Sequence, residues 1–564
     1  MGNHLPGRRR VPAAHPFPVL SASAIIANLR LFRIIPPMNT TQTPSSHWAD
    51  INAAKIVREK GEKEVYVCAS GITPSGTVHI GNFREIISVE LVVRALREMG
   101  RKVRFIYSWD DYDVFRKVPK NMPRQEMLKA NLRRPITLVP DPYGVEESYA
   151  RYHEAEVERE LHQVGIHPEY LYQARRYMAS EYAEQIRTAL EKTAEIRRIL
   201  DAHRTESLEE DWKPVSVFCG SCGRDTTTVL SWDGGYGLEY SCSSCGGHET
   251  IDLRTTSLAK LPWRVDWPMR WAYEKVDFEP AGKDHHSEGG SFDTAREVVR
   301  RIYHHEPPVT FQYDFISIKG RGGKISSSSG EVVSLKDVLE VYTPELTRYL
   351  FAGTRPNTEF AISFDLDVIK IYEDYDKTER IHYGAEPADD RRREKERRIY
   401  ELSQVGPVPA EMPFQVPFRH LCNLLQISSG DVEKTLDALP GLAPEQRDRM
   451  RTRAVCAWNW ITRFAPEDFR FALAGTEDPP VDVSGGARDA IRRLRALLEE
   501  KFHSLDEKSL GEAVYDVCRE AGIEPKSFFV EIYRVLVGKE KGPRLAAFIL
   551  TVGKERILGI LGKY

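Results

Sequence analysis

The chain has 564 residues, of which 41% are hydrophobic and 29% are charged, and its formal net charge is -3 at pH 7. These values are those of an ordinary soluble globular protein of about three or four domains, and no apolar run approaches the roughly 18 residues that a membrane span needs. The net charge gives no global signal of nucleic-acid binding, so a nucleic-acid partner would have to bind to local basic patches.

The first 45 residues are left outside the fold prediction, because the folded pattern begins only near His47. Residues 8–37 are rich in Arg, Pro and Ala and contain no acidic residue, which is the composition of a targeting peptide. The alternative that we favour is that translation starts at Met38. Deletion of residues 1–37 is then expected to leave activity intact.

The first predicted elements form a strand, a loop, a helix and a second strand. Residues 64–70 (EVYVCAS) form a buried strand, and the apolar residues from Ile80 onward recur at helical spacing until Gly100 closes the helix. The strand at 102–108 runs into an acidic turn at 109–113 (WDDYD), whose carboxylates either meet a ligand at the strand ends or cap the next helix. This order is the opening unit of a doubly wound α/β sheet.

The loop at 73–82 (TPSGTVHIGN) lies between that strand and the helix N-terminus. Free backbone N–H groups and the positive end of the helix dipole favour a phosphate there, and His79 can donate to a phosphate oxygen. The alternative is a tight Gly/Pro turn with a capping histidine. The predicted ATP-binding residues in this loop are Thr73, Pro74, Ser75, His79, Gly81 and Asn82, with His79 and Asn82 assigned to catalysis.

A segment at 215–253 breaks the helical pattern that begins near residue 146, and it contains short strands, many Gly and Ser, and two CxxC pairs. The pairs are separated by 19 residues, which suits a closed tetrahedral zinc site of four thiolates in a ribbon. The alternative is a degenerate ribbon that keeps its cysteines for packing. The predicted ligands are Cys219, Cys222, Cys242 and Cys245, and the buried hydrophobic cysteines are Cys68, Cys422, Cys456 and Cys518. The pattern is one of a reducing compartment.

Residues 276–318 again have the pattern of the α/β sheet, with a predicted helix at 292–302 and a predicted strand at 309–318 (VTFQYDFISI). The Gly/Ser loop at 322–330 follows that strand, and its single lysine, Lys324, suits a clamp on a triphosphate. Taken alone, such a loop is more often a linker. The predicted ATP-binding residues here are Lys324, Ser326, Ser327 and Ser328, with Lys324 assigned to catalysis.

The two loops resemble the HIGH and KMSKS signatures of class I aminoacyl-tRNA synthetases, and here they are HIGN (79–82) and KISSS (324–328). Ser327 occupies the position of the usual second lysine, so one pyrophosphate contact is in doubt, and Lys319 or Arg321 is expected to replace it. The segments similar to the lysyl members of the class are 109–113, 260–271 (KLPWRVDWPMRW), 282–286 and 538–545. The similarity runs from about residue 47 to the end.

The resemblance implies an α/β fold with a Rossmann-type catalytic domain, split by a zinc-ribbon insertion and followed by an α-helical anticodon-binding region. The expected parts are an extension (1–45), the first half of the catalytic domain (46–135), the insertion (136–261, ribbon at 215–253), the second half (262–334), a connecting module (335–400) and the anticodon-binding domain (401–564). It also implies ATP-dependent activation of lysine to lysyl-adenylate and transfer to tRNA(Lys), with Mg²⁺ accompanying ATP, structural Zn²⁺ and a cytoplasmic location.

A lysine pocket needs aromatic walls for the apolar stem and a carboxylate or hydroxyl group at the ammonium. The predicted lysine-binding residues are Gly71, Thr73, Trp267, Asp284, His285 and Tyr313. Trp267 is four residues from Trp271 on a predicted helix, so both are equally well explained as core residues. A glutamate pocket would instead need an arginine, and Arg264 and Arg270 keep that alternative open.

Three alternatives remain at this point. A glutamyl- or glutaminyl-type class I synthetase shares the expected fold and helical C-terminal half. A nucleotidyltransferase with an HxGH loop is disfavoured because Asn82 replaces the last histidine and the chain is too long. A non-catalytic tRNA-binding paralogue is disfavoured because both His79 and Lys324 are present.

Overall fold

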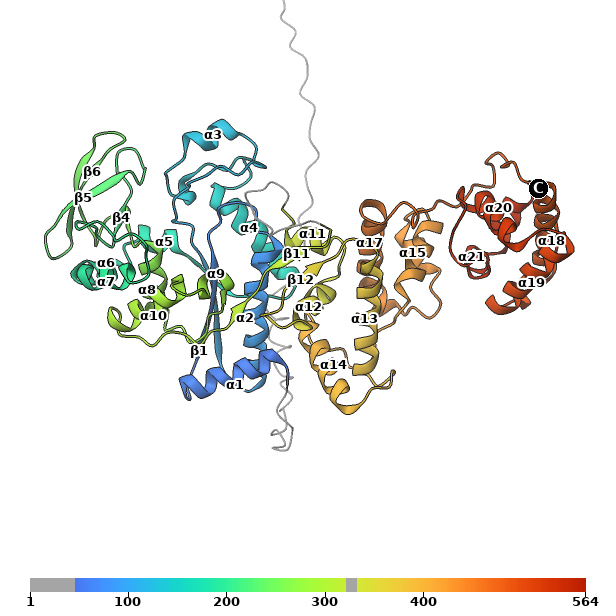
Figure 1. Cartoon of the computed structure of the whole chain (residues 1–564), viewed down its shortest axis with the longest axis horizontal. Coiled ribbons are helices and arrows are strands. Elements are labelled where there is room, and N and C mark those ends of the chain that lie inside the picture. The colour runs from blue at the N-terminus through green and yellow to red at the C-terminus, as the bar shows by residue number, and fades with distance from the viewer. Residues whose placement is uncertain (1–45, 321–331) are drawn as a thin grey trace, which may run out of the picture. The chain divides into compact units, whose positions relative to one another are not determined.

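The computed structural model describes residues 46–320 and 332–564 (Figure 1). After α1 (Trp48–Lys60), the chain forms β1 (Tyr66–Ile72), α2 (Ile80–Glu98) and β2 (Val103–Trp109), so the predicted strand, loop, helix and strand are confirmed. Gly100 has a φ of 78° directly after α2, and the N–H of Arg101 turns back to the carbonyl of Leu96 at 3.0 Å. A left-handed residue is what a helix C-terminus of this kind requires.

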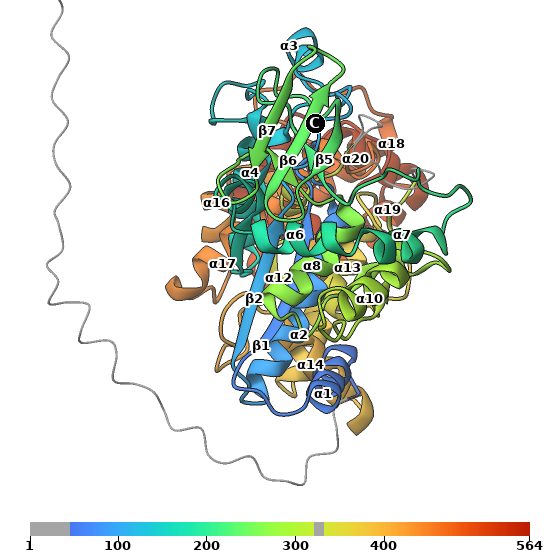
Figure 2. The same cartoon turned by 90° about the vertical axis from the view of Figure 1, so that its left-hand side faces the viewer.

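Five parallel segments lie side by side around β1. β1 pairs with β2 from Tyr66↔Val103 to Ile72↔Trp109, and β2 pairs with β3 (Glu169–Tyr172). On the other side of β1, Phe278 forms parallel bridges to Cys68 and Val309, and β9 (Ala281–Gly282) pairs with β10 (Gln312–Tyr313). The order is β3, β2, β1, 277–282 and 309–313, which is one of the doubly wound arrangements. β1 and β2 lie side by side in Figure 2. Residues Tyr66 to Ala69 are buried, as is usual for an interior strand of a parallel sheet whose faces are covered.

Two details of this sheet differ from the expectation. β3 lies inside the part of the insertion that was expected to be mostly helical. The strand expected at 309–318 is divided into β10 and β11 (Ile316–Ile318), and β11 pairs in parallel with β12 (Phe360–Ile362). The strands β3, β10 and β11 have two to four residues each, so local periodicity carries little information about them.

The helix α2 is fixed to the second half of the sheet by one guanidinium group. Arg84 is 2% exposed, and its two terminal nitrogens donate to the carbonyls of Asp314, Phe315, Arg355 and Thr358 at 2.9, 3.1, 2.9 and 2.7 Å. Burial lowers the pKa of Arg84 to about 10, so the group stays charged at neutral pH. Four carbonyls from two segments therefore depend on a single donor group.

The insertion consists of short helices followed by an antiparallel β5-β6-β7 sheet. The helix α3 (Gln125–Ala130) precedes the insertion. Besides β3, the elements within residues 136–261 are η2 (Ile136–Leu138), α4 (Tyr149–Gln163), α5 (Gln173–Met178), α6 (Ala183–Glu191), α7 (Thr193–Asp201), β4 (Ser216–Val217), β5 (Thr227–Trp232), β6 (Gly237–Cys242), β7 (His248–Asp252) and β8 (Ala259–Lys260). The following elements are α8 (Trp263–Glu274), α9 (Lys283–His286) and α10 (Ser291–Arg301), and α10 confirms the helix expected near 292–302.

The rest of the described chain is helical apart from β12, as expected. Its elements are α11 (Leu335–Leu339), α12 (Pro344–Ala352), α13 (Asp367–His382), α14 (Asp390–Ser403), α15 (Phe418–Ile427), α16 (Val432–Asp437), η3 (Pro444–Gln446), α17 (Arg447–Arg463), α18 (Gly485–Lys501), η4 (Phe502–Ser504), α19 (Glu507–Glu520), α20 (Pro525–Val537), α21 (Leu545–Val552) and α22 (Lys554–Leu561). No helix of the described residues is long and apolar enough to cross a membrane.

Packing divides this helical region in a place that the sequence did not indicate. Helices up to α17 share one hydrophobic core with the parallel sheet, through residues such as Tyr372, Phe418 and Trp460. Helices α18 to α22 form a separate core around Leu494 and Phe528. The change of core lies between α17 and α18, whereas the predicted start of the last domain was residue 401.

Candidate active site

The loop between β1 and α2 is shaped by a glycine. His79 is the N-cap of α2, and its backbone N–H donates to Oδ1 of Asn82 at 3.3 Å. A Cβ at Gly81 would lie 2.8 Å from Nδ1 and 2.9 Å from Cε1 of His79, closer than side chains approach each other. The imidazole therefore lies against the first turn of α2 only because residue 81 has no side chain.

The first signature segment contacts the described residues that follow the second one in the sequence. Ser334 forms an antiparallel bridge with His79, and the N–H of Ile80 donates to the carbonyl of Val333 at 2.8 Å. Lys324, Ser326, Ser327 and Ser328 lie outside the described residues, so their roles remain predictions. Lys319, considered as a replacement for the missing lysine, is paired with Asp365 at 2.9 Å and with Asp367.

A cavity of about 340 Å³ opens beside the first signature loop. Thr73 and Ser75 line one side, and Arg116 and Lys117 are among the residues that line the remainder. Thr73 donates from Oγ1 to Asp113 at 3.0 Å. Hydroxyl groups and two cations around a cavity are suited to a phosphate-bearing ligand.

The acidic turn at the end of β2 is occupied by internal partners. Nζ of the buried Lys260 lies 2.5 Å from Asp113. Burial raises the pKa of Asp113, but the charge and hydrogen bond of Lys260, the hydrogen bond of Thr73 and the charge of Arg270 together lower it. Asp111 accepts the N–H of Ala174 at 2.7 Å at the start of α5, and burial raises its pKa to about 7. Asp111 therefore contacts the N-terminus of α5, which is not the next helix along the chain.

Arg270 is likewise neutralised inside the protein. Its guanidinium lies 2.7 Å from Asp110 and 3.1 Å from Asp266, and it donates to Oγ of Ser108 at 2.6 Å. Arg264 donates to Oγ1 of Thr294 at 3.2 Å. Arg270, one of the two arginines that kept a glutamate pocket open, is thus already paired with two carboxylates.

Glu85 is a carboxylate that the sequence analysis did not single out. It lies two turns into α2 and accepts from Tyr313 Oη at 2.5 Å, Ser70 Oγ at 2.8 Å and the N–H of Gly71 at 3.2 Å. Burial raises its pKa, and the three donors oppose that rise. No Lys, Arg or His of the described residues lies within 4.0 Å of it, so this carboxylate has hydrogen-bond donors but no counter-ion.

A second carboxylate faces the tryptophans of α8. Glu279 is 8% exposed and accepts the indole N–H groups of Trp267 at 3.0 Å and Trp271 at 2.6 Å. Burial, with a contribution from the charge of Glu85, raises its pKa to about 7. Within the described chain it also lacks a salt-bridge partner, so two adjacent acids are left without a cation.

The structure brings together most of the predicted lysine-binding residues. Gly71 and Tyr313 both donate to Glu85, and the rings of Trp267 and His285 lie 5.9 Å apart. Thr73 instead contacts Asp113. Asp284 is exposed on the four-residue helix α9. Glu85 and Glu279 gave no sequence signal, because nothing local distinguishes them from other glutamates of the chain.

The four predicted zinc ligands converge. Their sulfur atoms lie within 4.8 Å of one another, with Cys219 to Cys245 at 3.5 Å and Cys222 to Cys242 at 3.7 Å. Tetrahedral zinc with Zn–S bonds of about 2.3 Å requires sulfur atoms roughly 3.8 Å apart. Each CxxC pair is followed by a glycine in the left-handed region, Gly223 at φ 73° and Gly246 at φ 74°. The donor set and both turns fit a zinc ion.

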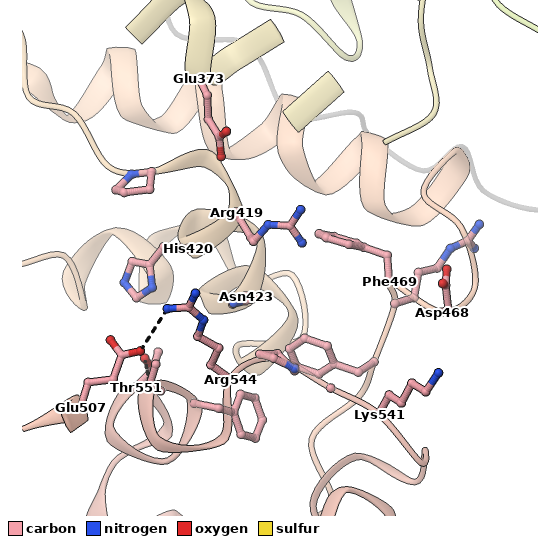
Figure 3. A pocket seen from close by; sticks show the side chains of 17 residues that line it. Glu373, Arg419, His420, Asn423, Asp468, Phe469, Glu507, Lys541, Arg544 and Thr551 are labelled. Atoms are coloured by element: carbon pink, nitrogen blue, oxygen red, sulfur yellow. Dashed lines mark hydrogen bonds and ion pairs between the residues drawn. The ribbon is translucent and has the colours of Figure 1, made fainter. Parts of the chain in front are cut away.

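A larger cavity of about 780 Å³ lies in the C-terminal helical region (Figure 3). Arg419 and His420 of α15 line one side, and Lys541 and Arg544 line the other. Arg419 lies over the ring of Phe469 at 5.6 Å, and Arg544 lies 3.8 Å from Glu507. Cations next to aromatic rings suit unpaired nucleotides, whose bases stack and whose phosphates are negative.

The chain belongs to the family whose model is described as tRNA synthetases class I (K), which matches residues 46–406. Curated relatives named lysine–tRNA ligase are similar over nearly their whole length. The protein of Borreliella burgdorferi is 56% identical over 92% of this chain and 99% of its own, and that of Treponema pallidum is 53% identical over the same shares. The protein of Thermococcus kodakarensis is 42% identical over 91% of this chain and 98% of its own.

Replacement of Gly81 by alanine tests the contact with His79. We expect Gly81→Ala to reduce lysine-dependent ATP–pyrophosphate exchange about a hundredfold, because an alanine Cβ displaces the imidazole by about 1 Å. The thermal stability should not fall, because alanine favours a helix over glycine. Exchange is measured with saturating tRNA.

Gly511→Ala is the matched control, since residue 511 lies inside α19 with nothing within 4 Å of an added Cβ. That variant should keep normal exchange. Exchange by Gly81→Ala within threefold of the unmodified protein would show that the position of His79 is not critical.

Proposed function

We propose that this chain is a lysine–tRNA ligase, which activates lysine with ATP and transfers it to the 3′ end of tRNA(Lys). The observation that carries the substrate is the pair of carboxylates, Glu85 and Glu279, that have no counter-ion among the described residues. Glu85 is held by three donors, so its oxygens are fixed before a ligand arrives, and the ammonium group of lysine supplies the missing positive charge. Trp267 lines the apolar stem, and the fully buried Trp271 packs behind it.

The same charges disfavour glutamate as a substrate. A glutamate side chain would bring a third carboxylate toward Glu85 and Glu279, and like charges in a partly buried site repel each other strongly. Arg270 cannot compensate without abandoning Asp110 and Asp266, which would leave two buried acids unpaired.

The chemical step depends on charge stabilisation in the two signature segments. His79 donates to the α-phosphate while the lysine carboxylate attacks it, and Lys324 with Ser326, Ser327 and Ser328 binds the departing pyrophosphate. Thr73, Ser75 and Asn82 line or shape the nucleotide site, and Mg²⁺ shields the phosphates. The catalytic domain is of the Rossmann type, because the ligand-binding loops follow the carboxyl ends of parallel strands. The protein works in the cytoplasm.

The role of Glu85 is tested by the conservative change Glu85→Gln. We expect the KM for lysine to rise about tenfold to a hundredfold, which is the effect of removing a charge-assisted hydrogen bond. The KM for ATP should stay within about twofold. Both constants are measured by pyrophosphate exchange at saturating tRNA, with glutamate tested as a second substrate that should not support exchange.

The same constants are measured for Asp284→Asn, because the sequence analysis predicted that Asp284 binds lysine. A larger rise in the KM for lysine in Asp284→Asn than in Glu85→Gln would indicate that the ammonium group of lysine binds to Asp284 instead of Glu85. An equal effect of Glu85→Gln on lysine and ATP would contradict a specific lysine contact.

The four cysteines hold one structural zinc ion per chain. The metal closes the ribbon with thiolate ligands and leaves no open position for water, so its role lies in folding of the insertion. Cys219 and Cys242 belong to the same hydrophobic core as Val265 and Met269 of α8, so that core joins the ribbon to the helix that carries Trp267.

Elemental analysis of freshly purified protein should find one equivalent of zinc. Cys219→Ser should lose it and lower the thermal stability of the insertion, while Cys518→Ser, which changes a buried cysteine of another core, should keep it. Zinc-free native protein, or unchanged zinc content in Cys219→Ser, would exclude this site.

The cavity of Figure 3 receives unpaired nucleotides of the tRNA anticodon loop. Lys541 and Arg544 contact phosphates, and Phe469 offers a face for base stacking. The double variant Lys541→Ala/Arg544→Ala should raise the KM for tRNA about tenfold with unchanged KM for lysine. The slope of log affinity against log salt should fall by about 1.4, which corresponds to two lost contacts to a single strand.

Lys526→Ala is the control, because Lys526 is exposed on α20 and does not line the cavity. An unchanged tRNA KM and salt slope in the double variant would show that the cavity does not bind tRNA.

A further inference from the structure

A third cavity, of about 680 Å³, lies at the opposite end of the parallel strands from the proposed lysine pocket. Its lining includes Asp277, whose carboxylate accepts the N–H of Val67 near the start of β1 at 3.0 Å. Gly71, at the lysine pocket, is four residues further along β1, roughly 13 Å away at about 3.3 Å per residue. The proposed function makes no use of this cavity.

Five cations line the cavity, and its acids neutralise only part of their charge. Asp277 is paired with Lys63 at 2.6 Å, and Glu306 is paired with Arg300 at 3.2 Å. The third acid, Glu59, lies 3.6 Å from Arg58, which is outside the lining. The remaining cations, Lys55, Lys60 and Arg296, have no carboxylate within 4.0 Å among residues 46–320 and 332–564.

These three cations line the cavity from two elements, α1 and α10. Lys60 and Lys55 extend from α1 to the segment at 307–310, where their Nζ atoms donate to the carbonyls of Pro307 at 2.7 Å and Thr310 at 3.3 Å. Each ammonium group keeps further N–H donors. Arg296 belongs to α10. The donors thus converge on one concave space instead of following a flat stripe, as an RNA backbone would require.

The pKa values of neighbouring groups reflect burial together with charges of both signs. Burial lowers the pKa of Lys60, the charge of Lys63 acts in the same direction, and Asp277, Glu306 and Glu59 oppose it. Burial and the charge of Lys60 lower the pKa of His305, and Asp277 opposes that change. The case for an anion site therefore depends on the positions of the cations.

We propose that this cavity binds a small polyanion of the diphosphate or triphosphate class, as free pyrophosphate or as part of a nucleotide. Its volume is that of a site for a ligand of this size. The ammonium groups of Lys55 and Lys60 and the guanidinium of Arg296 bind the phosphate oxygens. The site is separate from the ATP site formed by the two signature loops, and it is present whichever amino acid the protein activates.

Calorimetric titration of the full chain with pyrophosphate, without magnesium, tests the site. We compare the unmodified protein with the double variant Lys60→Ala/Arg296→Ala. The unmodified chain should bind one equivalent more than the variant, or bind it at least a hundredfold more tightly, because each lost charge-assisted contact is worth about tenfold or more. The KM for ATP in pyrophosphate exchange should be unchanged, which assigns the lost equivalent to this cavity instead of the ATP site.

Arg391→Ala/Lys508→Ala, which removes two cations that line none of the three cavities, should bind as the unmodified chain does. Parallel titrations with ADP distinguish the two sources, since a nucleotide site binds ADP more tightly than pyrophosphate and a pyrophosphate site does the reverse. Equal stoichiometry and affinity in the unmodified chain and the Lys60/Arg296 variant would overturn the proposal. A weaker tRNA affinity in that variant, with no change in pyrophosphate binding, would overturn it also and make the surface an RNA contact.

Discussion

The hydrogen bonds of Arg84 are the interaction on which the rest of the site depends. A single guanidinium joins α2 to the carbonyls of Asp314, Phe315, Arg355 and Thr358, which belong to segments more than two hundred residues away in the chain. The first two turns of α2 carry His79 and Glu85. Fixing this helix therefore sets the distance between the proposed phosphate donor and the proposed ammonium acceptor, which one rigid element holds better than two mobile loops would.

The charges of the site follow a consistent pattern around that helix. The buried cations Lys260 and Arg270 are each paired with carboxylates of the acidic turn, so they hold that turn in place and are not available to a substrate. The carboxylates of Glu85 and Glu279 have only neutral donors. Paired charges thus support the structure, while the two acids without a salt-bridge partner among the described residues are the basis of the proposed preference for a cationic ligand.

Local patterns predicted the parts of this structure that are local. Patterns of neighbouring residues define the strand, loop and helix from residue 64 to Gly100, and they also define the two CxxC pairs. The structure has these features as expected. Glu85 was not predicted as a site residue, because the residue that marks it, Tyr313, donates a hydrogen bond to it from 228 positions away in the sequence. For the same reason β3 was not predicted, and β10 was predicted as part of a longer strand. Pairing with distant strands, and not their own periodicity, makes these segments strands. The start of the separate C-terminal core was likewise a matter of packing between distant helices.

The position of β1 in the middle of the sheet has a consequence for how the chain folds during synthesis. β1 and β2 leave the ribosome early, but the segment around Phe278 that covers the other edge of β1 follows about 170 residues later, a delay of roughly 10 to 30 s at ordinary rates of translation. During that time the buried residues of β1 present an unpaired apolar edge, which is a template for aggregation. Slow translation through the insertion would prolong this exposure, so the yield of native protein should depend on chaperones that hold nascent chains, even though every finished molecule has that edge fully covered.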